Sequence, residues 1–287
     1  MKRRIAVLAA TAAAATVMTG ATASQATPAP LRYVALGDSY SAASGVLPVD
    51  PTAPQCLRST SNYPHVIAGR TGAALTDVTC GAAQTKDFFA PQYSGMQPQL
   101  DAVRTDTQLV TMTIGGNDNN TFIGAIVTCG AAGLSTLGQG SPCKDRYGSS
   151  FTDDIKSKTY PALVKALKAV HARAPHARVA ILGYPWILPP TDGCFDKMPV
   201  AEGDVPYLRN LQATLNDAVR RAAAATGSTY VDLSTVSEGH DACQAIGTRW
   251  VEPVLQGTNP VVVHPNALGE SRMADRTIKV LGLGLQG

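Results

Sequence analysis

The stretch YVALGDSYSAASG, residues 33–45, begins as a strand and ends in small and polar residues. Its apolar run, residues 33–36, is typical of a strand buried in a sheet, and Gly37 ends that run. Asp38 and Ser39 then stand at the strand's tip. Either this is an ordinary turn with a helix cap, or Ser39 is a nucleophile presented to a substrate.

Four similar apolar runs follow, at residues 75–78, 109–114, 179–182 and 229–233. They are continuous rather than alternating, as in strands buried on both faces. Apolar residues at helical spacing predict helices between and after these runs. One helix starts near Pro161, another ends near Gly227, and a last one runs from Asn266 to about Leu281. This alternation predicts a three-layer α/β/α sandwich around a central parallel sheet. Residues 121–150 and 186–206 are expected to be irregular and to wall a pocket.

The first residues predict a secretory signal peptide at 1–23. Residues 2–4 are Lys-Arg-Arg, the next fourteen are apolar and too few to span a bilayer, and Ala21-Thr22-Ala23 fits a cleavage site. Residues 24–30 then form a flexible mature N-terminus, and 31–287 a single domain. The protein is therefore expected to be secreted into the medium.

Removal of the predicted signal peptide lowers the formal net charge of the chain. The full chain has 24 basic and 21 acidic residues, but three of the basic residues lie in the signal. The remainder is formally neutral, which gives no basic patch for nucleic acid and no polybasic run for a membrane surface. We expect no nucleic-acid partner, no stable membrane anchor and a monomeric enzyme.

Six cysteines remain in the exported chain, an even set that predicts disulfides. Fifteen connectivities are possible, and the sequence alone does not choose among them. Loop closure favours neighbours, so the expected pairs are Cys56–Cys80, Cys129–Cys143 and Cys194–Cys243. The spacing of zinc ligands is absent, and neither a metal nor another cofactor is expected.

Four segments with chemically useful side chains are expected at one edge of the sheet, because the carboxyl ends of parallel strands meet there. They carry Ser39, the Gly81–Ala82 turn, Asn117 and His264. A histidine can take the proton of a serine hydroxyl near neutral pH. Backbone amides and the Asn117 side chain can donate to the oxyanion of acyl transfer, which a carboxylate at 117 could not do.

Three motifs in this order, GDSYS at 37–41, TIGGND at 113–118 and HPN at 264–266, resemble those of the SGNH/GDSL hydrolase family. With the six cysteines, the mature chain resembles the secreted actinobacterial GDSL lipases and esterases over its full length. The resemblance implies a flavodoxin-like SGNH hydrolase fold with Ser39 as nucleophile and His264 as base. Ser39, Asn117 and an amide at Gly81 or Ala82 would form the oxyanion hole.

The chain departs from many family members before the histidine, where an aspartate is common three residues earlier. That position is Val261 here, so no side-chain acid can orient His264 from it. The resemblance to the actinobacterial branch implies a Ser–His dyad with a backbone carbonyl holding the imidazole, and Val261 is the expected carbonyl. A second histidine, His240, is expected to be structural.

The sequence thus predicts a secreted serine ester hydrolase, a lipase or carboxylesterase acting on acylglycerols and simple esters. A phospholipase A1 and a carbohydrate acetylesterase are alternatives that use the same site. A secreted, non-catalytic binding module on the same fold is the alternative from another class. The expected partners are lipid or small ester substrates.

Overall fold

A parallel sheet organises the molecule in this computed structural model, which describes Met1 and residues 29–286. Within the described residues, five strands pair side by side in the order β2-β1-β3-β4-β5, all parallel. They are β1 (Arg32–Ala35), β2 (Ala74–Asp77), β3 (Leu109–Met112), β4 (Arg178–Leu182) and β5 (Thr229–Val231). The strand order reverses beside β1, so the carboxyl ends of β1 and β3 are the expected place for a ligand.

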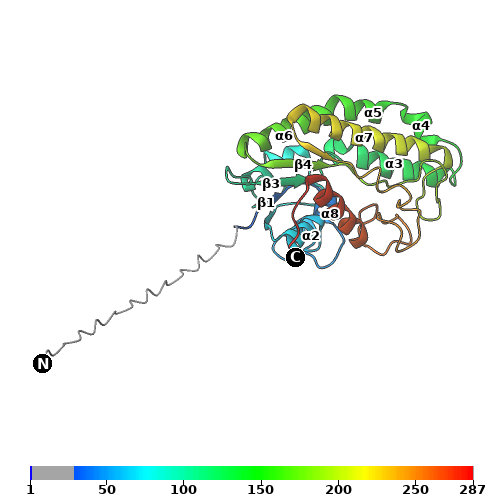
Figure 1. Cartoon of the computed structure of the whole chain (residues 1–287). Coiled ribbons are helices and arrows are strands. Elements are labelled where there is room, and N and C mark those ends of the chain that lie inside the picture. The colour runs from blue at the N-terminus through cyan, green and yellow to red at the C-terminus, as the bar shows by residue number, and fades with distance from the viewer. Residues whose placement is uncertain (2–28, 287) are drawn as a thin grey trace.

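Helices cover both faces of this sheet and make the three layers (Figure 1). The α-helices are α1 (Ser39–Ala42), α2 (Tyr63–Thr71), α3 (Phe122–Ser135), α4 (Pro142–Tyr147), α5 (Ser150–Asp154), α6 (Tyr160–Arg173), α7 (Val205–Thr226) and α8 (Ala267–Leu281). Helices α2 and α8 pack on one face, and α3, α6 and α7 on the other. The expected three-layer α/β/α fold is confirmed.

The side chains of β1 illustrate how the sheet divides the core. Tyr33 and Ala35 point into the cluster under α2 and α8, whereas Val34 and Leu36 point into the larger cluster under α3, α6 and α7. Successive strand residues face opposite sides, so a strand covered by helices on both faces must be apolar throughout. Strand β2 differs because it lies at the edge of the sheet, where its residues are exposed or half-buried.

One expectation about local structure was wrong. Most of residues 121–150 is helical rather than irregular, because α3 and α4 lie within it. Phe122, Ala125, Ile126 and Cys129 are buried at helical spacing, and this apolar face outweighs the glycines between them. Of the other stretch, residues 186–201 contain no helix or strand, as expected, whereas residues 202–206 are helical.

The three expected disulfides are all present: Cys56–Cys80, Cys129–Cys143 and Cys194–Cys243. The first ties the loop after β2 to the segment after α1, and the second ties α3 to α4. The third joins two loops, around residues 194 and 243. The predicted signal peptide and most of the predicted flexible N-terminus lie outside the described residues. Among the described helices, none combines the length and apolarity that crossing a membrane requires.

Candidate active site

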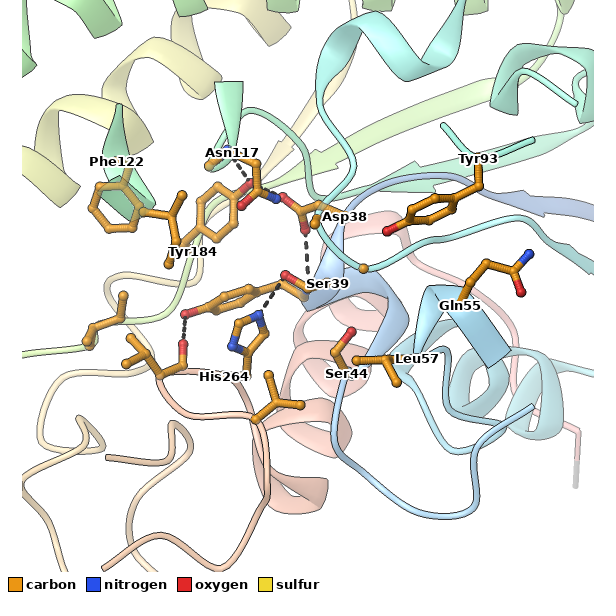
Figure 2. A pocket seen from close by; sticks show the side chains of 18 residues that line it. Asp38, Ser39, Ser44, Gln55, Leu57, Tyr93, Asn117, Phe122, Tyr184 and His264 are labelled. Atoms are coloured by element: carbon orange, nitrogen blue, oxygen red, sulfur yellow. Dashed lines mark hydrogen bonds between the residues drawn. The ribbon is translucent and has the colours of Figure 1, made fainter. Parts of the chain in front are cut away.

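Four segments that are distant in sequence converge at the carboxyl edge of the sheet (Figure 2). They are the turn after β1 with Ser39, the loop after β2 with Gly81 and Ala82, the turn after β3 with Asn117, and the loop before α8 with His264. All of these residues line one cavity of about 260 Å³. The structure therefore brings together the residues that the sequence singled out.

Ser39 is the first residue of α1, directly after the β1 turn. Asp38 caps this helix by accepting a hydrogen bond from the Tyr40 amide at 3.1 Å. Gly37 makes the turn with φ of +124°, and a Cβ there would lie 2.4 Å from the Thr113 carbonyl oxygen. Only glycine allows the chain to leave the strand this sharply, so the turn fixes where the Ser39 hydroxyl lies.

Ser39 and His264 form a hydrogen-bonded pair. The Ser39 Oγ lies 2.7 Å from His264 Nε2, and the His264 Nδ1 lies 2.7 Å from the Val262 carbonyl oxygen. A carbonyl can only accept, so Nδ1 carries the proton of the neutral imidazole and Nε2 is free to accept from the serine. Burial lowers the pKa of His264, while the Val262 carbonyl opposes that shift. The neutral form that can act as a base is thus favoured.

The carbonyl that orients His264 is therefore Val262, and the expectation of Val261 was wrong. Val263 has a left-handed backbone with φ of +60°, which turns the preceding carbonyl toward the imidazole. The carbonyl that reaches Nδ1 thus lies two residues before the histidine, not three. Val261 instead lines the cavity, and its amide donates to the Asn259 side chain at 2.9 Å.

Tyr40 supports the same loop. Its hydroxyl donates to the Val263 carbonyl at 2.7 Å, and its ring lies 5.2 Å from the His264 ring between centroids. The Val263 amide donates to the Glu252 carbonyl at 2.9 Å. The strained residue is thus held by a hydrogen bond on each side, as residues with unusual backbone angles require. Sequence reasoning missed Tyr40 because nothing local links it to residue 263.

A candidate oxyanion donor must have an amide hydrogen that does not already donate to another group of the protein. The Gly81 amide donates to the Cys56 carbonyl at 2.8 Å, whereas the Ser39 and Ala82 amides make no hydrogen bond within residues 29–286. Asn117 lines the cavity and donates one amide hydrogen to the Ala83 carbonyl at 3.1 Å, and its second amide hydrogen has no partner within residues 29–286. Of the two amides left open by the sequence, Ala82 is the available one.

Two buried carboxylates hold these turns together. Asp38 accepts hydrogen bonds from the Thr113 hydroxyl at 2.7 Å and the Tyr184 hydroxyl at 2.5 Å, in addition to the Tyr40 amide. Asp118 accepts from the amide and hydroxyl of Thr85, on the neighbouring loop. Burial raises the pKa of Asp38 to about 6, against the hydrogen bonds that lower it, and also raises that of Asp118.

His240, the second histidine considered from the sequence, lies apart from the cavity. His240 stacks on Trp250 with 4.6 Å between ring centroids, and its Nδ1 lies 2.6 Å from the Thr248 carbonyl oxygen. Among residues 29–286, no group of three or more His, Cys, Asp or Glu side chains is placed to hold a metal ion.

The cavity has two different sides (Figure 2). Phe122 and Tyr184 lie on one side of Ser39. Ile123, Ile187 and Val263 add further apolar side chains to the lining of the cavity. The other side is formed by Ser44, Gln55, Leu57 and Tyr93, of which only Ser44 is buried. Ester cleavage needs a place for an acyl chain and a place for an alcohol, and the two sides differ in the chemistry they offer.

Comparison with known proteins gives consistent matches. A model of the GDSL-like lipase/acylhydrolase family matches residues 35–272. Lipase 2 of Streptomyces coelicolor is 69% identical over 261 residues, covering 90% of this chain and 88% of that protein.

Two solved structures share the fold over nearly their whole length. Phospholipase A1 from Streptomyces albidoflavus has a TM-score of 0.72 and 29% identity, covering 88% of this chain and 99% of its own. The extracellular lipase from Streptomyces rimosus has a TM-score of 0.71 and 31% identity, with 88% and 98% covered. The chain therefore belongs to the GDSL-like lipase/acylhydrolase family and is a hydrolase of the lipase/esterase class.

Proposed function

We propose that the chain is a secreted serine ester hydrolase that cleaves acylglycerols and simple carboxylic esters through a Ser39–His264 dyad. One observation carries this proposal: the Ser39 Oγ lies 2.7 Å from the unprotonated Nε2 of His264, in a cavity with an apolar wall. This is the distance at which a base can take the proton of a hydroxyl nucleophile.

In the first half of the reaction, the Ser39 Oγ attacks the ester carbonyl carbon while its proton passes to His264 Nε2. The carbonyl oxygen becomes an oxyanion, which accepts hydrogen bonds from the amides of Ser39 and Ala82 and from the side chain of Asn117. The imidazolium is stabilised by the Val262 carbonyl, which accepts from Nδ1 at 2.7 Å. The bond to the alcohol oxygen then breaks, and His264 returns the proton to that oxygen as the alcohol leaves.

In the second half, a water molecule replaces the alcohol. His264 takes a proton from it, and the water oxygen attacks the acyl carbon bound to Ser39. The same three donors hold the second oxyanion. Breaking the Ser39–acyl bond releases the acid and returns the proton to Ser39.

The apolar wall supports an acyl chain longer than acetate. Phe122, Ile187 and Val263 are buried residues of the cavity lining, and their side chains offer no hydrogen-bond donors. Burying methylene groups against such a wall is favourable by about 0.8 kcal/mol for each group.

A phospholipase A1 activity is the second candidate. The structure from Streptomyces albidoflavus that is similar over 88% of this chain is described as a phospholipase A1. The same dyad would cleave the ester of a phospholipid, because the reacting group is the same.

Export of the mature enzyme is supported by two independent features. The chain begins with a basic segment and an apolar segment of signal-peptide length. Its three disulfides suit an oxidising compartment. N-terminal sequencing of protein recovered from the culture medium tests this, and a mature N-terminus near residue 24 is expected.

The activity is tested with p-nitrophenyl esters from acetate to palmitate, comparing the wild type with Ser39→Ala and Asn117→Ala. We expect activity highest at medium or long chains, no turnover in Ser39→Ala, and a loss of ~100-fold or more in Asn117→Ala, the usual effect of one lost oxyanion donor. A fluorophosphonate that labels the wild type but not Ser39→Ala would identify the nucleophile directly.

Each other outcome has a defined meaning. Activity confined to acetate would indicate an acetylesterase with a small pocket. Activity that survives in Ser39→Ala would place the chemistry elsewhere. A folded wild type that neither turns over esters nor takes the label would be the binding module that the sequence left open.

A further inference from the structure

Helix α3 presents an exposed face that carries no charge. Between Asp118 and Lys144 the chain has no acidic or basic residue, although charged residues make up 16% of the sequence. One side of α3 packs on the core, whereas on the other side Val127 is 67% exposed and Leu134 55%. Helices α6 and α7, in the same layer, instead carry lysine and arginine outside their buried faces. An exposed apolar helix face of this kind marks an interaction surface.

The exposed face of α3 begins at the catalytic cavity. Ile123 lines the cavity, and Val127, Gly130 and Leu134 follow it at helical spacing, so the four residues lie along one side of the helix. At a rise of about 1.5 Å per residue, this side extends roughly 16 Å from the cavity lining. The apolar surface is therefore continuous with the place where an ester would bind.

Leu137 extends this surface at a cost to the fold. It follows the helix, is 82% exposed and has a left-handed backbone with φ of +52°, in which leucine is more strained than asparagine or glycine. A side chain this exposed gains little burial to offset the strain. Phe195 lies beside it, because a Cβ added to Gly138 would lie 2.8 Å from the Phe195 ring. A contact outside the chain explains this leucine better than folding does.

The polar groups near this surface do not favour a protein partner. The hydroxyls of Ser135 and Thr136, next to Leu134, donate to carbonyls of α3 itself rather than outward. Specific protein interfaces need about one hydrogen bond for each 100–200 Å² of buried area. The side chains of this face supply few of the donors that such an interface would use.

Acidic side chains border the far end of the surface. Asp192 and Glu202 line the same surface hollow as Leu137 and Phe195, and both are exposed. Exposed carboxylates repel an anionic surface, and residues 119–143 hold no lysine or arginine to attract one. The occupant that fits is a lipid surface without net charge, against which apolar side chains leave water and no charge is buried.

We propose that the exposed side of α3, together with Leu137 and Phe195, docks the protein reversibly on a lipid surface without net charge and so brings the cavity to that surface. The use of docking rests on the proposed function, since esters of the surface would enter the cavity beside Ile123. Docking itself needs no turnover, because the apolar side chains enter the lipid whether or not an ester is cleaved.

Docking is measured by co-sedimentation of the mature protein with phosphatidylcholine vesicles, in a Ser39→Ala background that leaves the lipid intact. Leu134→Gln should weaken binding roughly tenfold, the effect of a leucine that leaves water on docking and a glutamine that does not. Leu137→Asn should weaken binding similarly but keep or raise the melting temperature, because asparagine tolerates the left-handed backbone. Adding anionic phosphatidylglycerol to the vesicles should not tighten binding.

Leu285→Asn is the matched control. Leu285 is 64% exposed but lies at the opposite edge of the sheet, where the amide of the next residue donates to the Arg70 carbonyl at 2.9 Å, shortly before β2 begins. This variant should bind vesicles as tightly as its Ser39→Ala parent. In the active enzyme, Leu134→Gln and Leu137→Asn should lower the rate on emulsified tributyrin and leave kcat/KM for soluble p-nitrophenyl butyrate unchanged.

Vesicle binding that is absent in the parent, or unchanged in both α3-face variants, would overturn the proposal. Equal losses on the emulsion and the soluble ester would also overturn it, since the helix would then only shape the cavity. A dimer that Leu134→Gln converts to a monomer would assign the face to a second copy of the chain instead. A protein that docks through this face but cleaves neither ester would remove the proposed function and support the docking, so the two failures are distinguishable.

Discussion

Replacing Tyr40 by phenylalanine tests whether the loop that carries His264 is held in place by a single distant hydroxyl. The change removes the hydrogen bond of 2.7 Å to the Val263 carbonyl and keeps the ring, which lies against His264. Tyr40 is 6% exposed and Val263 4%, so solvent reaches the freed carbonyl poorly. A buried acceptor that loses its donor costs about 1–3 kcal/mol of folding stability.

The effect on catalysis arises from the backbone of Val263. A branched residue with φ of +60° costs about 1–3 kcal/mol, which is the size of the hydrogen bond that opposes it. Without Tyr40 Oη, the strain is opposed mainly by the bond from the Val263 amide to Glu252. If the free-energy difference between the aligned and misaligned conformations of the His264 loop changes by about 1.4 kcal/mol, the ratio of their populations changes tenfold. We therefore expect kcat to fall several-fold, up to about tenfold, with little change in KM.

The assay is steady-state hydrolysis of a p-nitrophenyl ester, together with thermal unfolding. Tyr33→Phe is the matched control, because its buried hydroxyl lies 2.6 Å from the Thr111 hydroxyl on the other face of the sheet. Both variants should lose stability, but only Tyr40→Phe should lose kcat. Wild-type kcat in Tyr40→Phe, or an equal loss in Tyr33→Phe, would refute the reasoning.

Three further predictions concern the same turns. Ala82 has φ of +62°, so Ala82→Gly should keep activity and raise the free energy of unfolding by up to about 1 kcal/mol. Gly81→Ala should instead lower the melting temperature, because its Cβ would lie 2.8 Å from the Cys56 carbonyl oxygen. A strong loss of activity in Ala82→Gly would contradict this reasoning. The folded-state pKa of Asp38 is about 6 against an unfolded value of about 3.9, so the unfolded chain releases this proton first and stability falls as pH rises between these values. Denaturation at pH 4 to 7 should show that Asp38→Asn removes up to about 3 kcal/mol of this fall, and an identical pH dependence would count against it. Because the lowered pKa of His264 keeps the imidazole neutral, kcat/KM should fall on the acid side with a midpoint below about 6.5, and a midpoint above 7 would exclude His264 as the base.

The resemblance of three short motifs to a known family already predicted the convergence of the site. It could do so because parallel strands deliver the residues after their carboxyl ends to one edge of the sheet. Ser39, Asn117 and His264 line one cavity for this reason, although they span 225 positions. The strands were readable because their apolar runs reflect burial on both faces, which neighbouring residues encode. Helix α3 differs from the predicted loop because its glycines are compatible with either state, whereas burial of its apolar face against the core stabilises the helix.

The sequence by itself determined the fold class and the residue types at the strand ends, and it favoured the disulfide pairs that close short loops, which the structure confirmed. Only the tertiary structure decided which backbone groups are available. Val262 rather than Val261 faces His264 because Val263 is held in a left-handed conformation by Tyr40 and Glu252. Likewise, the Ala82 amide has no hydrogen-bond partner within residues 29–286, whereas the Gly81 amide donates to the Cys56 carbonyl. Every residue other than proline carries the same backbone groups, so their use depends on contacts between distant segments, which no local pattern records.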